Sequence, residues 1–320
     1  MRLQQRSFRF RLCRPLQTAA GVVNERRGWL LRLEDEDGRL GWGEVSPLSA
    51  DQLALCGARV VRLPQLLSRH ALDAELVSSP AALGFGLGAA VAELDGLVGG
   101  SSEPWRQAPP PAWLLPAGER MPEVLASVLE EQGSQPSLTF KWKVATAGDA
   151  VERRLLEQLL ERLPATGRLR IDANGGWDRA TAQSWKERLV GDPRFAWLEQ
   201  PLAPDDQQGL EDLAGLGPVA LDESLDKDPS LRNRWGGWQV RRPLLEGDPR
   251  PLLRQLQECV PYRMLSTAFE TGIGRRWLHH LAALQLQGPT PVAPGLAPGW
   301  CPSGPLFSDD PAAVWEAASP

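Results

Sequence analysis

The sequence predicts an α/β protein in which a (β/α)7β TIM-like barrel follows an α+β N-terminal domain. Short apolar runs recur from residue 113 onward with amphipathic stretches between them, a pattern typical of alternating strands and helices. Three of these runs end at an acidic residue, namely Asp172, Glu199 and Asp222. Barrel enzymes carry their chemistry at the carboxyl ends of the strands, so the three acids are predicted to meet there.

The N-terminal part has the pattern of a β-meander followed by a helix. Residues 8–12, FRFRL, alternate apolar and basic side chains, as expected of an edge strand. Asp37-Gly38 lies between two further alternating runs and predicts a hairpin turn. Residues 79–98 have a helical pattern, and the proline-rich passage 104–116 predicts a domain boundary near residue 105.

Three glycines, Gly84, Gly86 and Gly88, fall within the predicted N-terminal helix. A dinucleotide-binding loop would need a strand before them and an acidic ribose partner after them, and the sequence offers neither. Close packing of the helix against a neighbour is the favoured interpretation.

The barrel strands are predicted from seven apolar runs and a weaker eighth. Between the second and third runs, residues 151–163 place their leucines on one face of a helix. We expect the eighth strand within residues 291–296. The seven runs are Trp113–Leu115, Leu138–Lys143, Leu169–Asp172, Phe195–Glu199, Val219–Asp222, Trp238–Arg242 and Tyr262–Ser266.

Composition favours small-molecule chemistry in a reducing compartment. A chain of 320 residues is long enough for a barrel of roughly 250 residues and a smaller domain. The net charge of −5 argues against nucleic-acid binding. The four cysteines form no CxxC pair, which favours the cytoplasm, and the most lipid-like stretch, residues 81–92, is shorter than the roughly 20 residues that span a bilayer.

Two lysines are predicted to join the acids. Alternate residues of a strand share a face, so Lys141 and Lys143 point together, and Arg170 points with Asp172. Taken singly, an acid after a strand is more often the cap of the next helix, and paired lysines are more often an exposed edge. Three acids at successive strands behind two lysines favour a metal site with a base beside it.

The motifs that carry these residues resemble those of the enolase superfamily, in its muconate-lactonizing-enzyme subgroup. They are the KxK pair, D-x-N, E-Q-P and D-E-S after successive strands, and GxGE-x-x-P near residue 44. The resemblance implies that Asp172, Glu199 and Asp222 bind Mg²⁺ or Mn²⁺, and carboxylate oxygens suit Mg²⁺. It also implies that Lys143 is the base and that Lys141 stays charged and stabilises the ene-diolate formed by proton removal.

Strand six departs from the family pattern, because Arg242 stands before Pro243 where a lysine is usual. Arginine stays protonated at neutral pH, so a mechanism with two bases is disfavoured. A syn-dehydration needs one base, and Arg242 can serve as the second cation. Among the reactions that the resemblance implies, this favours dehydration of a cyclohexadiene carboxylate in menaquinone and phylloquinone biosynthesis. Racemisation of N-acylamino acids, dipeptide epimerisation and a non-catalytic binding barrel are the alternatives.

The resemblance also implies a set of substrate-binding residues and a capping domain. The hydroxyl pair Ser266 and Thr267 has an equally weighted alternative, since such residues after a strand often cap a helix. The capping domain is expected to comprise residues 1–104 with about 303–320, a loop near residues 18–27 to cover the site, and residues 105–302 to form the barrel. Oligomeric state is left open. The predicted substrate-binding residues are Arg170, Asn174, Ser266, Thr267, Gly295 and Leu296.

Overall fold

The computed structural model describes residues 1–18, 21–133 and 138–319. They form two compact units. The first comprises Met1–Pro109, Arg241–Pro261 and Leu265–Pro320, and the second Pro110–Val240 with Tyr262–Met264. The functional division into a capping domain and a barrel stays a prediction.

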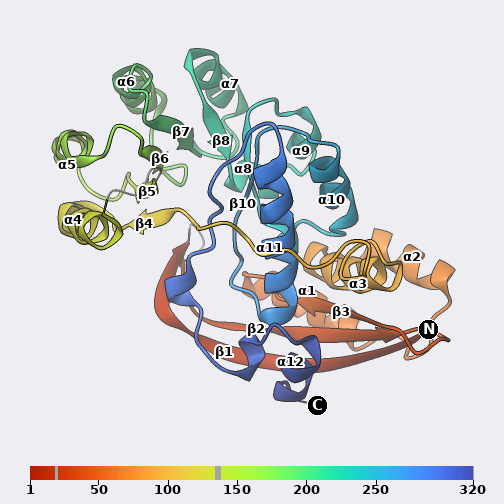
Figure 1. Ribbon diagram of the computed structural model, residues 1–320. Coiled ribbons are helices and arrows are strands. Elements are labelled where there is room, and N and C mark those ends of the chain that lie inside the picture. The colour runs from red at the N-terminus through yellow and green to blue at the C-terminus, as the bar shows by residue number, and fades with distance from the viewer. Residues whose placement is uncertain (19–20, 134–137, 320) are drawn as a thin grey trace. The chain divides into compact units, whose positions relative to one another are not determined.

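The first unit contains a three-stranded antiparallel sheet with the order β1-β2-β3 (Figure 1). Its strands are β1 (Arg2–Thr18), β2 (Gly21–Glu34) and β3 (Leu40–Val45). Phe8 and Phe10 are buried while Arg9 and Arg11 are exposed, which confirms the predicted edge strand. The predicted loop near residues 18–27 is a strand from Gly21 onward, and residues 19 and 20 lie outside the described residues.

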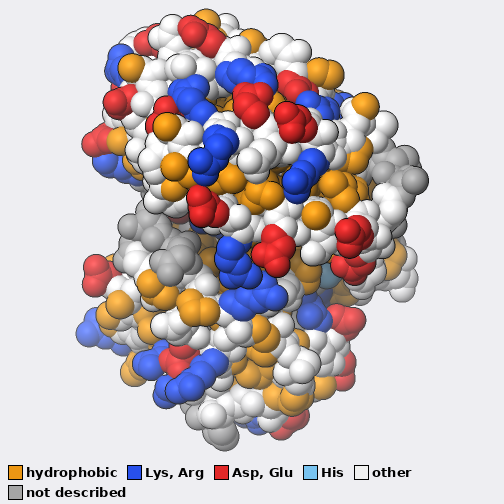
Figure 2. Space-filling view, turned by 90° about the vertical axis from the view of Figure 1, so that its left-hand side faces the viewer, with side chains coloured by type: hydrophobic (Ala, Val, Ile, Leu, Met, Phe, Trp, Pro, Cys, Tyr) orange, Lys and Arg blue, Asp and Glu red, His pale blue; other side chains and the backbone are white. Residues whose placement is uncertain are grey.

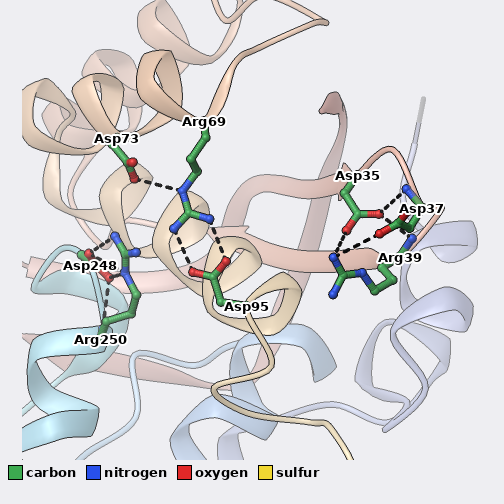
Figure 3. Close-up of polar contacts among 8 residues, drawn as sticks. All are labelled: Asp35, Asp37, Arg39, Arg69, Asp73, Asp95, Asp248 and Arg250. Carbon is green, nitrogen blue, oxygen red and sulfur yellow. Dashed lines mark hydrogen bonds and ion pairs between the residues drawn. The ribbon is translucent and has the colours of Figure 1, made fainter.

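A tight turn joins β2 to β3, as the Asp37-Gly38 pair predicts. The Asp35 carboxylate accepts hydrogen bonds from the backbone N–H of Asp37 at 3.0 Å and of Arg39 at 2.9 Å. Gly38 has a φ of +77°, a conformation that glycine adopts without strain. Figure 3 shows this turn beside the ion pairs of Arg69 on helix α2 (Arg69–Ser78).

Helix α3 (Ala81–Leu94) packs against β3 with backbone almost touching backbone. A Cβ added at Gly43 would lie 1.9 Å from the carbonyl oxygen of Gly86, and one at Gly41 would lie 2.0 Å from that of Ala90. Both distances are far below van der Waals contact. Gly86 is thus a packing glycine, as predicted, and the two glycines of the GxGE motif are needed for the same approach.

Gly43→Ala should therefore destabilise the fold, because the added methyl group forces β3 away from α3. Overpacking of this kind costs about 1–3 kcal/mol or more in unfolding free energy. Urea denaturation followed by circular dichroism measures the loss. Gly100→Ala is the matched control, since its Cβ would have no neighbour within 4 Å. Equal stability of the two variants would contradict this account of the motif.

The glutamate of the same motif joins β3 to helix α11 (Gly272–Gln287). Glu44 is fully buried and accepts hydrogen bonds from the Thr271 hydroxyl at 2.6 Å and from the Gly274 N–H at 2.9 Å. A carboxylate at a helix N-terminus satisfies otherwise unpaired N–H groups. The remaining helices of this unit are α1 (Ala50–Val60), α10 (Arg250–Gln257) and α12 (Pro311–Ala317).

The second unit carries the parallel strands of a seven-stranded sheet with the order β10-β9-β8-β7-β6-β5-β4. All seven predicted strands are confirmed within two residues at each end. The expected eighth strand is reduced to one parallel bridge between Ser266 and Gly295. The strands are β4 (Trp113–Leu115), β5 (Thr139–Lys143), β6 (Arg168–Asp172), β7 (Phe195–Glu199), β8 (Val219–Leu221), β9 (Trp238–Arg241) and β10 (Arg263–Leu265).

Helices cover one side of these strands, as Figure 1 shows for α5, α6 and α7. Trp142 of β5 is fully buried on the helix side, where its ring centroid lies 6.2 Å from that of Trp185 in α6. Its neighbours Lys141 and Lys143 therefore face the other side of the sheet. The helices are α4 (Met121–Gln132), α5 (Asp149–Arg162), α6 (Arg179–Leu189), α7 (Gln207–Leu216), α8 (Glu223–Lys227) and α9 (Leu231–Arg234).

One lysine lies inside this helical layer. Lys186 of α6 is fully buried, donates a 2.6 Å hydrogen bond to the Pro218 carbonyl, and has its pKa lowered to about 7 by burial. The unfolded chain holds this proton up to about pH 10.4. Between pH 7 and that value the unfolded state binds more protons, so stability rises with pH.

The unfolding free energy of the wild type should therefore rise relative to that of Lys186→Met by roughly 2 kcal/mol between pH 7 and pH 9. Urea titrations of both proteins at several pH values measure the difference, and the comparison cancels the other titrating groups. Parallel pH profiles would show that Lys186 keeps its proton when buried.

Charged side chains of both signs are interspersed over the face in Figure 2. Exposed ion pairs among the described residues include Arg179–Asp206 and Arg188–Glu157. Within the described residues, no helix is both long and apolar enough to cross a membrane.

Candidate active site

The register of the parallel strands places three predicted site residues side by side. Lys143 of β5 pairs with Asp172 of β6, and Asp172 pairs with Glu199 of β7. Each is the last residue of its strand. Asp222 follows the last residue of β8, which is the next strand in the sheet. The predicted gathering of acids and lysine at the strand ends is thus present in the second unit.

Lys141 provides the positive charge of this cluster. Its Nζ lies 2.8 Å from Asp172 Oδ2 and 2.5 Å from Glu199 Oε1, and both acids are almost fully buried. Burial raises the pKa of Glu199, Lys141 opposes that shift, and the charges of Asp172 and Asp222 raise the pKa further. The negative charges of the acids therefore repel one another, and the Lys141 ammonium lies between Asp172 and Glu199.

The donor set fits a hard divalent cation. Three buried carboxylates on adjacent strand ends carry more negative charge than Lys141 neutralises, and carboxylate oxygens are what Mg²⁺ prefers. In the described part of the chain, no three His, Cys, Asp or Glu side chains are already gathered as a metal cage. Lys141 lies between Asp172 and Glu199, so a cation would share these oxygens with it or displace it.

Arg170 reinforces the cluster from the same face of β6. Its guanidinium is fully buried and lies 4.3 Å from the centre of the Trp197 ring. Burial lowers the pKa of Arg170 to about 10, and the negative charge of Glu199 opposes this shift. The Trp197 indole in turn donates to Glu199 Oε2 at 3.4 Å. Arg170 thus faces inward with Asp172, as the strand alternation predicts.

Asn174 connects the end of β6 to the start of α8. Its backbone N–H donates to Asp172 Oδ1 at 3.0 Å, and its side-chain amide donates to Glu223 Oε1 at 2.9 Å. Burial raises the pKa of Glu223 to about 7, helped by Asp222 and Asp172. Glu223 is not among the residues predicted from the sequence, although its place beside Asp222 in the D-E-S motif was a usable signal.

Strained backbone marks the same strand ends. Ala145, Asn174 and Gln200 follow β5, β6 and β7, and their φ angles are +60°, +45° and +37°. Side chains other than glycine rarely adopt this left-handed region, and such residues concentrate at functional sites. The strained backbone is therefore a second observation, independent of the charges, in favour of a functional site at these strand ends.

The first unit holds the remaining predicted site residues as a separate group. The Arg242 guanidinium donates to the Thr267 carbonyl at 2.8 Å and to the Ser266 hydroxyl at 3.2 Å. Ser266 also bridges to Gly295. Arg241, by contrast, is buried in an ion pair with Glu246 at 2.5 Å. A chemical role for Arg242 stays a prediction.

The hydroxyls of this group do not cap a helix. Thr271 is the N-cap of α11, whereas Thr267 donates to Glu270 at 2.6 Å and accepts from the Phe269 N–H at 2.8 Å. Leu296 is half-buried and packs against the apolar core of this unit. Substrate binding by Ser266, Thr267, Gly295 and Leu296 stays a prediction.

Known proteins share both the sequence and the fold. Residues 121–233 match the enolase C-terminal domain-like family. The o-succinylbenzoate synthase of Thermosynechococcus vestitus is 36% identical over 295 residues, which are 88% of this chain and 88% of that protein. The crystal structure of o-succinylbenzoate synthase from Thermosynechococcus elongatus BP-1, complexed with Mg in the active site, has a TM-score of 0.81 at 33% identity and covers 99% of this chain and 100% of its own.

A more distant structure shares the fold alone. The dipeptide epimerase of Enterococcus faecalis V583, complexed with Mg and the dipeptide L-Leu-L-Tyr, has a TM-score of 0.72 at 20% identity. The match covers 95% of this chain and 92% of that one. At this identity the likeness gives no information on which reaction the chain performs.

Proposed function

Because the chain belongs to the o-succinylbenzoate synthase family of the enolase superfamily, we propose that it dehydrates 2-succinyl-6-hydroxy-2,4-cyclohexadiene-1-carboxylate to o-succinylbenzoate. This is a hydro-lyase reaction of menaquinone and phylloquinone biosynthesis. The observation that carries the proposal is the alignment of Lys143, Asp172 and Glu199 across three adjacent strand ends. We place the reaction in the cytoplasm, with a small carboxylate as substrate and without a nucleic-acid or membrane partner.

Asp172, Glu199 and Asp222 are the proposed ligands of Mg²⁺, with Mn²⁺ as a substitute. A bound Mg²⁺ would supply positive charge that eases loss of a proton next to a carboxylate. Lys143 takes that proton on its Nζ and returns it to the departing hydroxyl on the same face, so that water leaves and the ring becomes aromatic. Lys141 keeps its proton, because it is held between two carboxylates, and its charge faces the developing negative charge.

Arg242 is the proposed second cation. Its guanidinium donates hydrogen bonds to the Thr267 carbonyl and to the Ser266 hydroxyl. Arginine does not act as a base at neutral pH. One base suffices for the dehydration, whereas racemisation and epimerisation need a base on each face of the reacting carbon. The dehydratase is therefore favoured over the racemase.

Replacing Arg242 with lysine should leave kcat within about threefold of the wild type, a change of less than 1 kcal/mol in the barrier. Lysine preserves the charge, and its ammonium can still donate to the Thr267 carbonyl. Arg242→Met, which has no charge, is the control and should be much slower. A collapse of activity in Arg242→Lys would show that the forked guanidinium itself is required.

The proposal is tested by following ultraviolet absorbance of the purified protein with Mg²⁺ and the cyclohexadiene substrate. Loss of the diene band that a chelator stops supports the dehydratase. If the band is stable, exchange of the α-proton of N-acylamino acids in deuterated water tests the racemase. If the protein has neither activity, a non-catalytic barrel used for binding is the remaining alternative.

We further propose that residues 1–104 with about 303–320 act as the capping domain and residues 105–302 as the catalytic barrel.

A further inference from the structure

We infer that Gln200 is a positioning residue that holds Asp222 and thereby sets the affinity of the acid cluster for Mg²⁺. The inference rests on the proposed function, because it assumes that Asp222 is a metal ligand. Gln200 follows Glu199 directly and is fully buried.

The side-chain amide of Gln200 is completely used. Its Oε1 accepts from the backbone N–H of Asp222 and from that of Ser224, both at 3.1 Å. Its Nε2 donates to the Ser224 hydroxyl at 2.7 Å and to the Leu202 carbonyl at 2.9 Å. Two donors and two acceptor positions are all that a carboxamide has. The side chain can therefore adopt only one orientation without leaving a buried group unpaired.

The backbone of Gln200 ties the same elements together. Its N–H donates to the Ala220 carbonyl of β8 at 2.8 Å, and its carbonyl accepts from Gly175, in the loop after β6, at 2.7 Å. These contacts accompany the left-handed φ of +37°. One residue thus links the ends of β6, β7 and β8, from which Asp172, Glu199 and Asp222 come.

The consequence for the cation follows from where Asp222 sits. Asp222 lies outside β8, with φ −121° and ψ −82°, so the strand ladder does not fix its backbone. The bond from its N–H to Gln200 Oε1 constrains this backbone from the end of β7, while the carbonyl of Asp222 accepts from the Leu225 N–H of α8 at 3.0 Å. Groups that orient metal ligands from behind typically change metal affinity by roughly 10- to 100-fold when they are removed.

Calorimetric titration of the substrate-free protein with Mg²⁺ tests the inference without using activity. Gln200→Met, which has a similar length and no hydrogen-bonding amide, should raise the Mg²⁺ dissociation constant by roughly 10- to 100-fold. A merely structural role would lower the unfolding temperature in chelator and leave this constant unchanged. Gln200→Asn, one methylene too short to reach both partners, should weaken binding in the same direction and serves if Gln200→Met does not fold.

Two variants serve as controls. Ser224→Ala removes one partner of Nε2 and keeps the bond to the Asp222 N–H, and Gln183→Met changes an exposed glutamine. Both should bind Mg²⁺ within about threefold of the wild type. If the wild type binds Mg²⁺ and Gln200→Met or Gln200→Asn binds it equally tightly, the inference about Gln200 is wrong, while the proposed metal site stands. A wild type that binds no Mg²⁺ would overturn the proposed metal site and the inference with it.

Discussion

Lys143→Ala should lower kcat by roughly 10²- to 10⁴-fold, the range that a positioned general base contributes. Without this amine, no other group of the proposed mechanism takes the α-proton and returns it to the hydroxyl. The diene absorbance assay measures the loss. Lys143 is half-buried, and the ion pairs to Asp172 and Glu199 are made by Lys141 instead. The acid cluster should therefore survive the substitution.

Two measurements separate this loss from a general defect. The Mg²⁺ affinity of Lys143→Ala should stay close to that of the wild type, because its acids are retained. Lys143→Arg keeps a long basic side chain but cannot accept a proton at neutral pH, so it should be as slow as the alanine variant. Unaltered turnover by either variant would exclude Lys143 as the base and with it the proposed mechanism.

Removing the metal should lower activity to a comparable extent. Treatment with a chelator should lower activity by about 10³-fold or more, since several kcal/mol of charge stabilisation are lost and each 1.36 kcal/mol is worth a factor of ten. Added Mg²⁺ should restore activity. The unfolding temperature should also fall on chelation, because a ligand that binds only the folded state stabilises it.

A matched pair of substitutions locates the cation. Asp222→Asn removes one carboxylate charge from the buried cluster and should reproduce most of the effect of the chelator. Asp226→Asn removes the same charge four residues later on α8, where the side chain is exposed, and should leave activity intact. Full activity after exhaustive chelation would show that the three acids serve another purpose.

The strands of the parallel sheet could be predicted because each is an uninterrupted apolar run that ends at a polar residue. Val219 to Leu221, for example, is buried along its whole length, so its hydrophobicity alone identifies it. The eighth strand could not be predicted in this way. Residues 291–296 contain Pro291 and Pro294, which lack the N–H that a strand ladder needs, and only Gly295 makes a bridge.

The charged residues of the site were predictable from spacing, whereas their supports were not. Lys141 and Lys143 share one face of their strand, and Arg170 and Asp172 share one face of theirs, because a strand has a period of two, a rule that needs no tertiary information. The bond between Gln200 and the Asp222 N–H joins residues 22 positions apart. A buried glutamine looks the same in a sequence as an exposed one, so only the folded chain identifies it.

The role of the two glycines in the GxGE motif also could not be predicted from the sequence alone. Gly41 and Gly43 read as ordinary strand residues until α3 is placed against them, when the 1.9–2.0 Å separations show that no side chain fits. The resemblance to a family identified the motif, but packing explains it. The glycines of the motif therefore allow β3 to pack closely against α3, and its Glu44 binds the N-terminus of α11.

The left-handed residues after β5, β6 and β7 bear on how this protein can be engineered. Each such residue costs on the order of 1–3 kcal/mol of native stability. A selection for heat resistance alone would thus favour glycine at Ala145 or Asn174 and relax the loops next to the proposed site residues. Directed evolution of a more thermostable variant should keep these positions unchanged and select stabilising substitutions elsewhere, because at these positions thermostability and the proposed turnover compete.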